Sequence, residues 1–137
     1  MRPMPSVVVD IARPPAQVWR ALTDANLFAA WMPGLRRAQV VAHEPGGLPQ
    51  EILFEFSTSL TYTLVYTYDV PAYEVRWEPR VGARDAVRGF ARIVASERGS
   101  ELTYALEQGA ARTAGDLVLG GPHAIVAAFT RWIEAQK

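Results

Sequence analysis

Hydrophobic and polar residues alternate along most of the chain with the period of two that is typical of β-strands. The first such segment covers residues 6–12, where Val7, Val9 and Ile11 share one face. Alternation returns in the centre of the chain and predicts six further strands, in residues 38–44, 50–58, 60–70, 73–78, 85–97 and 101–107. Short Gly-containing turns separate several of them, which predicts an antiparallel meander with one buried face and one exposed face.

Two short helices are predicted directly after the first strand. Pro14 and Pro15 end that strand, and proline is tolerated in the first turn of a helix, so the first helix is expected in Pro15–Thr23. Thr23-Asp24 offers a cap for a second helix in Ala25–Trp31.

The end of the chain has the period of an amphipathic helix, expected over residues 122–136. Its apolar face is formed by Ile125, Phe129, Trp132 and Ile133, and its opposite face by Thr130, Arg131 and Glu134. Residues 114–119 are expected to add an earlier turn or two to the same helix, with Gly120-Gly121-Pro122 as a kink or hinge inside it. Strands and helices are thus segregated along the chain, which predicts the α+β class.

Composition narrows the possible classes of protein. The chain has 137 residues, of which 50% are hydrophobic, so one domain over residues 1–137 with a substantial core is expected. Its 14 basic and 14 acidic residues give zero formal charge, which argues against nucleic-acid binding. The absence of cysteine fits a reducing compartment. With no signal peptide and no apolar run of roughly 18 residues, we expect no membrane span and a cytoplasmic location.

Three local sequences resemble a known family. Residues 9–19 are similar to an opening strand followed by an A-P-x-x-V-W helix start, and residues 24–33 to a D-x-x-x-x-x-x-W-x-P segment. Residues 99–104 resemble a G-T-x-L-T-Y hairpin. In this order they resemble the START-like (SRPBCC) superfamily, in particular the polyketide cyclase/dehydrase and lipid-transport family.

This resemblance implies a helix-grip fold, in which a curved antiparallel sheet of about seven strands wraps around a long C-terminal helix. It also implies an internal ligand cavity between the concave face of the sheet and that helix. The superfamily includes carriers, cyclases, hydrolases and chaperone regulators, so the fold does not choose among functions.

Aromatic residues at inward positions of the predicted strands and helices are the candidate ligand-binding residues. They are Trp31, Phe54, Phe56, Tyr62, Tyr66, Trp77, Tyr104 and Phe129. Aromatic walls with a few hydroxyl groups suit a flat and mostly apolar ligand. The alternative interpretation is that these side chains form an ordinary core.

Candidate catalytic residues are few. Tyr62, Tyr66 and His123 could donate or accept protons, although a surface or capping role is the alternative for His123. His43 and His123 do not form a metal-binding motif, and there is no phosphate loop or dinucleotide fingerprint, so no metal and no cofactor are expected. Arg88 and Arg92 are expected to point outward, because an unpaired buried arginine is costly.

Three functions remain open. The first is binding of a small hydrophobic molecule (aromatic, polyketide-like or lipid-like). The second is a cyclase/aromatase-type enzyme that acts by substrate positioning and proton transfer. The third is a protein-interaction module, with a possible homodimer. Polar groups that converge in a cavity would favour the enzyme, and an aromatic cavity with scattered hydroxyls would favour the binding protein.

Overall fold

A seven-stranded antiparallel sheet in the order β1-β7-β6-β5-β4-β3-β2 forms the frame of the protein. The computed structural model describes residues 5–57, 60–80, 87–107 and 122–136. The strands are β1 (Ser6–Ile11), β2 (Leu35–His43), β3 (Pro49–Phe56), β4 (Thr61–Asp69), β5 (Glu74–Pro79), β6 (Arg88–Ala95) and β7 (Ser100–Glu107). The described helices are α1 (Pro15–Thr23), α2 (Ala25–Trp31) and α4 (Pro122–Glu134).

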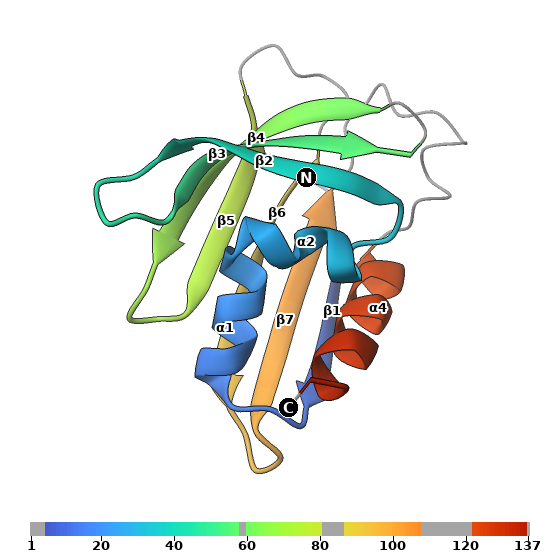
Figure 1. Cartoon of the computed structure of the whole chain (residues 1–137). Coiled ribbons are helices and arrows are strands. Elements are labelled where there is room, and N and C mark those ends of the chain that lie inside the picture. The colour runs from blue at the N-terminus through green and yellow to red at the C-terminus, as the bar shows by residue number, and fades with distance from the viewer. Residues whose placement is uncertain (1–4, 58–59, 81–86, 108–121, 137) are drawn as a thin grey trace.

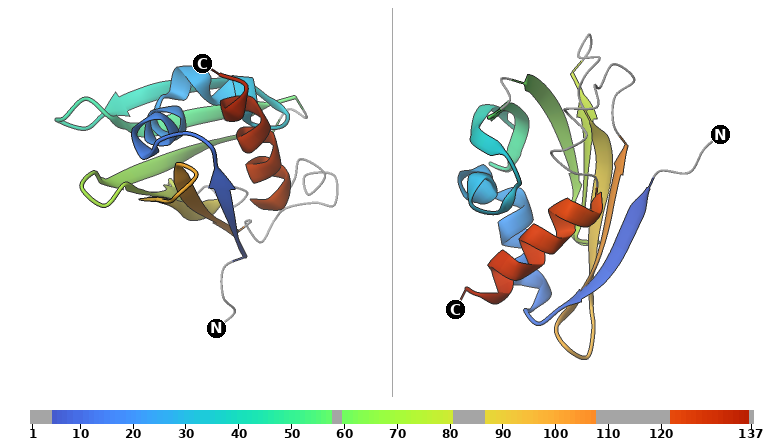
Figure 2. Two further views of the ribbon diagram at one scale, coloured as in Figure 1. Left: turned by 90° about the horizontal axis from the view of Figure 1, so that it is seen from below. Right: turned by 90° about the vertical axis from the view of Figure 1, so that its right-hand side faces the viewer.

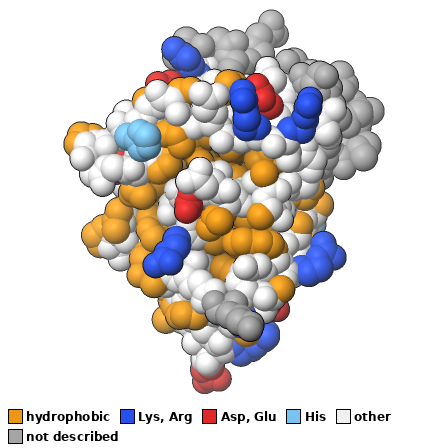
Figure 3. Space-filling model, viewed as in Figure 1, with side chains coloured by type: hydrophobic (Ala, Val, Ile, Leu, Met, Phe, Trp, Pro, Cys, Tyr) orange, Lys and Arg blue, Asp and Glu red, His pale blue; other side chains and the backbone are white. Residues whose placement is uncertain are grey.

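The three described helices lie on the concave side of the curved sheet (Figures 1 and 2). Helix α2 packs against β2 and α4, and α4 packs against β1 and β7. The two ends of the sheet thus approach each other through the helices. This arrangement is the predicted helix-grip fold, and hydrophobic side chains remain visible between the helices at the surface (Figure 3).

The predicted alternation is confirmed on the central strands. On β3, Ile52, Phe54 and Phe56 are buried, and the residues between them are more exposed. On β6, Gly89, Ala91 and Ile93 are buried, whereas Arg88 and Arg92 are exposed, as predicted. Because the period of two separates the two faces of each strand, the concave face collects nearly all of the large apolar side chains.

The two short helices begin and end where the sequence predicts. Pro15 occupies the first turn of α1, and the Asp24 carboxylate accepts a hydrogen bond from the Asn26 N–H at 3.0 Å to cap α2. Strand β2, in contrast, begins at Leu35, three residues earlier than predicted. It is an edge strand with shifts of register after Leu35 and Val40, and such bulges interrupt the alternation on which the prediction relied.

The C-terminal end of α4 is fastened to the segment between β1 and α1. The Arg13 guanidinium donates hydrogen bonds to the Gln136 carbonyl oxygen (2.8 Å from Nη2) and to that of Glu134. The Glu134 carboxylate accepts the Ala12 N–H at 2.9 Å. The prediction that Glu134 faces away is therefore wrong, because its carboxylate satisfies a backbone donor next to β1.

The earlier helical turns predicted in residues 114–119 and the hinge predicted at Gly120 and Gly121 lie outside the described residues. Within the described part of the chain, no helix is long and apolar enough to cross a membrane.

Candidate ligand-binding site

A cavity lies between the concave face of the sheet and the first turns of α4. Strands β3, β4, β5 and β7 form its wall, together with Val87 just before β6, Met32 and Pro33 just after α2, and Ile125 from α4. The space open to the centre of a water molecule is about 40 Å³. Its described lining residues are Met32, Pro33, Phe54, Phe56, Tyr62, Leu64, Tyr66, Trp77, Val87, Tyr104, Leu106 and Ile125.

Strand register brings the aromatic residues together. Phe54 on β3 pairs with Tyr62 on β4, and their rings lie 5.8 Å apart between centroids. Tyr66, further along β4, pairs with Trp77 on β5, and their ring centroids lie 6.0 Å apart. Trp77 in turn lies 5.2 Å from the ring of Tyr104 on β7. These residues, with Leu64 between Tyr62 and Tyr66 on β4, form a mostly aromatic wall that crosses the sheet from β3 to β7.

Gly89 allows this wall to pass over β6. It pairs with Trp77 on one side and Leu106 on the other. A Cβ atom at this position would lie 2.0 Å from the Ala105 carbonyl oxygen and 3.0 Å from Cζ2 of Trp77. The absence of a side chain lets the Trp77 ring lie close to the strand.

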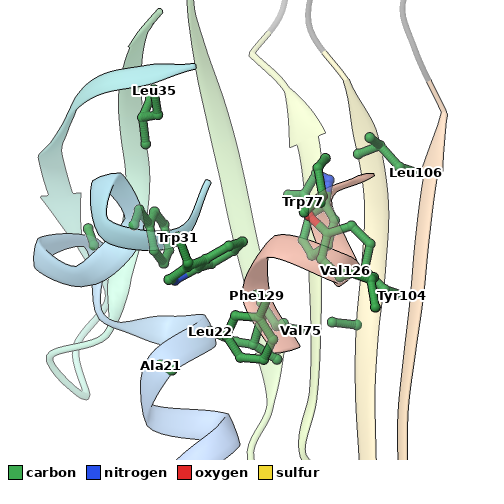
Figure 4. Packing of buried hydrophobic residues seen from close by; sticks show 14 of the residues in the cluster. Ala21, Leu22, Trp31, Leu35, Val75, Trp77, Tyr104, Leu106, Val126 and Phe129 are labelled. Atoms are coloured by element: carbon green, nitrogen blue, oxygen red, sulfur yellow. The ribbon is translucent and has the colours of Figure 1, made fainter. Parts of the chain in front are cut away.

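Six of the eight predicted ligand-binding residues line the cavity, and Trp31 and Phe129 do not. These two contact each other edge-to-face, with ring centroids 4.8 Å apart. They join α2 to α4 across from Trp77 and Tyr104, which project from the sheet (Figure 4). Trp31 is 5% exposed, and its indole N–H is buried without a hydrogen-bond partner. The pair is packed core beside the cavity.

The tyrosine hydroxyls supply most of the polar groups of the site. Burial raises the pKa of Tyr66 above the usual value of about 10, and the nearby hydroxyls of Tyr104, Tyr68 and Tyr62 raise it further. The pKa of Tyr104 is raised as well, mainly by burial and to a smaller extent by the hydroxyl of Tyr62. Both phenols are therefore neutral over the physiological pH range.

The tyrosines differ in their surroundings. Tyr68 donates to the Pro49 carbonyl oxygen at 2.6 Å, and its pKa is raised by burial and by the Glu44 carboxylate. Tyr66 and Tyr104, in contrast to Tyr68, are among the residues that line the cavity. Tyr66 and Tyr104 thus offer hydroxyl groups to whatever occupies the cavity.

The structure places His123 apart from the tyrosines. It is exposed on the first turn of α4 and lines a groove between α4 and β1, together with Val7 and Val9. Among the residues that the structure describes, no group of three His, Cys, Asp or Glu side chains could hold a metal ion.

Several lining residues were not singled out from the sequence. Leu64 and Leu106 lie on predicted inward faces between the aromatic residues, so the alternation contains a signal for them. Met32 and Pro33 follow α2 in a turn, and nothing in their local sequence indicates that they reach the sheet. Only the packing of α2 against β2 brings them there.

Three solved structures of similar shape cover nearly the whole chain. TTHA0849 from Thermus thermophilus has a TM-score of 0.78 and 14% identity, over 97% of this chain and 98% of its own. A START superfamily protein from Mycobacterium smegmatis has a TM-score of 0.72 and 15% identity, over 96% of this chain and 94% of its own. A STAR-related lipid transfer protein fragment from Xanthomonas axonopodis has a TM-score of 0.66 and 20% identity, over 93% of this chain and 84% of its own. These similarities show a shared START-like fold.

No curated protein sequence matches the chain. A family model described as "Polyketide cyclase / dehydrase and lipid transport" matches residues 5–135. The match spans every described strand and helix, and it agrees with the fold shared with the START proteins. The chain belongs to the polyketide cyclase/dehydrase and lipid-transport family.

Proposed function

We propose that this protein binds a small hydrophobic molecule in the cavity between the sheet and α4. The observation that carries this proposal is the aromatic wall from Phe54 to Tyr104, which borders open space. Concave and mostly apolar sites with a few polar groups are the usual form of small-molecule sites. The family description, which names polyketides and lipid transport, and the lipid transfer protein among the similar structures support a lipid-like or polyketide-like ligand, and the aromatic wall suits an aromatic one.

The size of the cavity constrains how binding occurs. Its volume of about 40 Å³ holds water molecules, whereas benzene occupies cavities of about 150 Å³. A ligand of ten or more atoms therefore requires the walls to move apart. Met32, Pro33 and Ile125 come from the helical side of the cavity, so a shift of α2 or α4 away from the sheet would enlarge it.

The alternative is a cyclase/aromatase-type enzyme that acts by substrate positioning and proton transfer. The hydroxyls of Tyr62, Tyr66 and Tyr104 around one cavity favour this alternative, because they could orient a reactive chain. The raised pKa of Tyr66 and Tyr104 makes them weak acids. No histidine or carboxylate is present among the described lining residues to act as a base. Binding is therefore the function that the site supports best.

Native mass spectrometry of the protein purified from its source tests the proposal. We expect a small molecule to accompany the folded chain and to be released on denaturation. Leu106→Phe adds volume inside the cavity and should abolish this association, at a cost of about 1–3 kcal/mol of stability. Val8→Phe is the matched control, because Val8 is 58% exposed.

Two results would contradict the proposal. One is a folded Leu106→Phe variant, verified by circular dichroism, that retains the molecule as fully as Val8→Phe does. The other is a source-purified protein that carries no small molecule and takes up no substituted naphthalene as an apolar probe.

A further inference from the structure

The described walls of the cavity carry no charge. Eight of the twelve lining residues are apolar without a polar side-chain atom, and the other four are Tyr62, Tyr66, Tyr104 and Trp77. Phenol and indole groups are uncharged at neutral pH. An anionic group placed among them would lose its hydration without gaining a counter-ion, and this is strongly unfavourable.

Two arginines of β5 and β6 form ion pairs on the opposite face of the sheet. Glu74 contacts Nε of Arg76 at 3.1 Å and Nε of Arg92 at 3.3 Å. Both guanidinium groups also lie over the Phe90 ring, at 5.2 and 5.7 Å from its centroid. These arginines point away from the cavity and are held by partners there, so they are not available to neutralise a ligand.

The polar atoms that the walls do offer are hydrogen-bond donors. An indole N–H only donates, and a phenol hydroxyl can donate or accept. The donors closest to the centre of the aromatic wall are the hydroxyls of Tyr66 and Tyr104 and the N–H of Trp77. All three side chains line the cavity, and neighbouring rings link Tyr66 to Trp77 and Trp77 to Tyr104. A ligand oxygen that accepts hydrogen bonds would satisfy these donors.

We propose that the cavity selects neutral ligands with an oxygen acceptor, such as a ketone or ester, held by Tyr66 and Tyr104, and rejects carboxylates and phosphates. This inference rests on the proposed function and names the chemical class of its ligand. The raised pKa of both phenols supports it, because they keep their protons and remain donors well above neutral pH.

Three matched naphthalenes test the proposal by isothermal titration calorimetry at neutral pH. They carry an acetyl, a carboxylate or an isopropenyl group at the same ring position, so they differ in charge and acceptor but little in shape. We expect the carboxylate to bind at least about a hundredfold more weakly than the ketone, because its charge must be desolvated. Its affinity should rise as the pH falls, since protonation makes it neutral.

Phenylalanine variants show whether the hydroxyls hold the acceptor. Tyr66→Phe and Tyr104→Phe should each weaken binding of the ketone by about three- to tenfold, the effect of one lost hydrogen bond. Binding of the isopropenyl compound should stay the same, because it has no acceptor. Tyr73→Phe is the matched control, since Tyr73 packs against Trp19 and is not among the lining residues.

The outcomes separate this inference from the proposed function. Equal affinity for the ketone and the carboxylate would overturn the selection of neutral ligands. An equal loss of ketone and isopropenyl binding in the two tyrosine variants would overturn the role of the hydroxyls. In both cases, binding in the cavity would stand. If none of the three compounds binds and no molecule accompanies the purified protein, the proposed function fails and this inference fails with it.

Discussion

Tyr66 and Tyr104 should govern how the protein responds to alkaline pH. Their pKa is raised on folding, because burial disfavours the charged phenolate. Above about pH 10 the unfolded chain loses these protons while the folded chain keeps them, so the unfolded state gains stability. The chain has no cysteine, and Lys137 is its single lysine, so few other groups titrate in this range.

The free energy of unfolding should be constant from neutral pH to about pH 9 and fall as pH rises above about 10. Each buried tyrosine contributes a slope of about 1.4 kcal/mol per pH unit. Urea unfolding over this range measures it. The double variant Tyr66→Phe/Tyr104→Phe should lose about two such contributions and keep that of Tyr68, whose pKa is also raised. An unchanged slope in the double variant would show that these two phenols do not titrate differently on folding.

Gly89 is a second residue whose importance comes from its contacts. Gly89→Ala should lower stability by at least about 2 kcal/mol, because its Cβ would collide with the backbone of Ala105 and with Trp77. Urea unfolding measures this loss. Gly46→Ala is the control, since its Cβ meets only Glu44 Oε1 at 3.7 Å, and it should change stability by no more than about 0.5 kcal/mol. A similar small effect at both glycines would contradict the close packing of Trp77 on β6.

At the scale of elements, α4 depends on a contact far from it in sequence. The last carbonyl groups of a helix have no partner within the helix, and a positive charge there is favourable. Arg13 supplies hydrogen-bond donors and a positive charge at the end of α4, where it binds the carbonyl oxygens of Glu134 and Gln136. Its own carbonyl oxygen accepts the Ser100 hydroxyl at 2.6 Å, which ties the same segment to the start of β7.

Arg13→Ala should therefore cost about 1.5–3 kcal/mol, the range for hydrogen bonds that involve a charged group. Arg13→Lys should recover only part of this loss, because lysine lacks the planar fork of donors. Arg37→Ala provides the comparison: the Arg37–Glu55 ion pair, at 3.1 Å, is largely exposed and should contribute no more than about 1 kcal/mol. Equal losses for Arg13→Ala and Arg37→Ala in urea unfolding would argue against the fastening of α4.

The elements themselves were predictable to different degrees. Helices α1 and α2 have the predicted bounds because local signals, proline in the first turn and an aspartate cap, define their ends. The inward faces of β3 to β6 follow from alternation, since burial on one face imposes a period of two. The early start of β2 was missed because bulges in an edge strand depend on its partner, β3.

For the whole molecule, binding and stability should be linked. If the acetyl naphthalene occupies the cavity of the folded state alone, then at about 100 times its Kd it should raise the free energy of unfolding by about 2.7 kcal/mol. Urea unfolding with and without the compound measures the increase. Leu106→Phe should abolish it and Val8→Phe should not. An increase of the same size in Leu106→Phe would place the binding site elsewhere.

The amino-acid sequence by itself determined the order of strands and helices, the inward faces of the central strands and the family, because each of these depends on local periodicity and local motifs. Six aromatic residues of the cavity wall followed from that periodicity. Only the tertiary structure decided that Trp31 and Phe129 close on each other, that Met32 and Pro33 reach the cavity, and that Arg13 holds the end of α4. These features join segments far apart in the chain, and their contacts arise from the curvature of the sheet and the packing of helices against it.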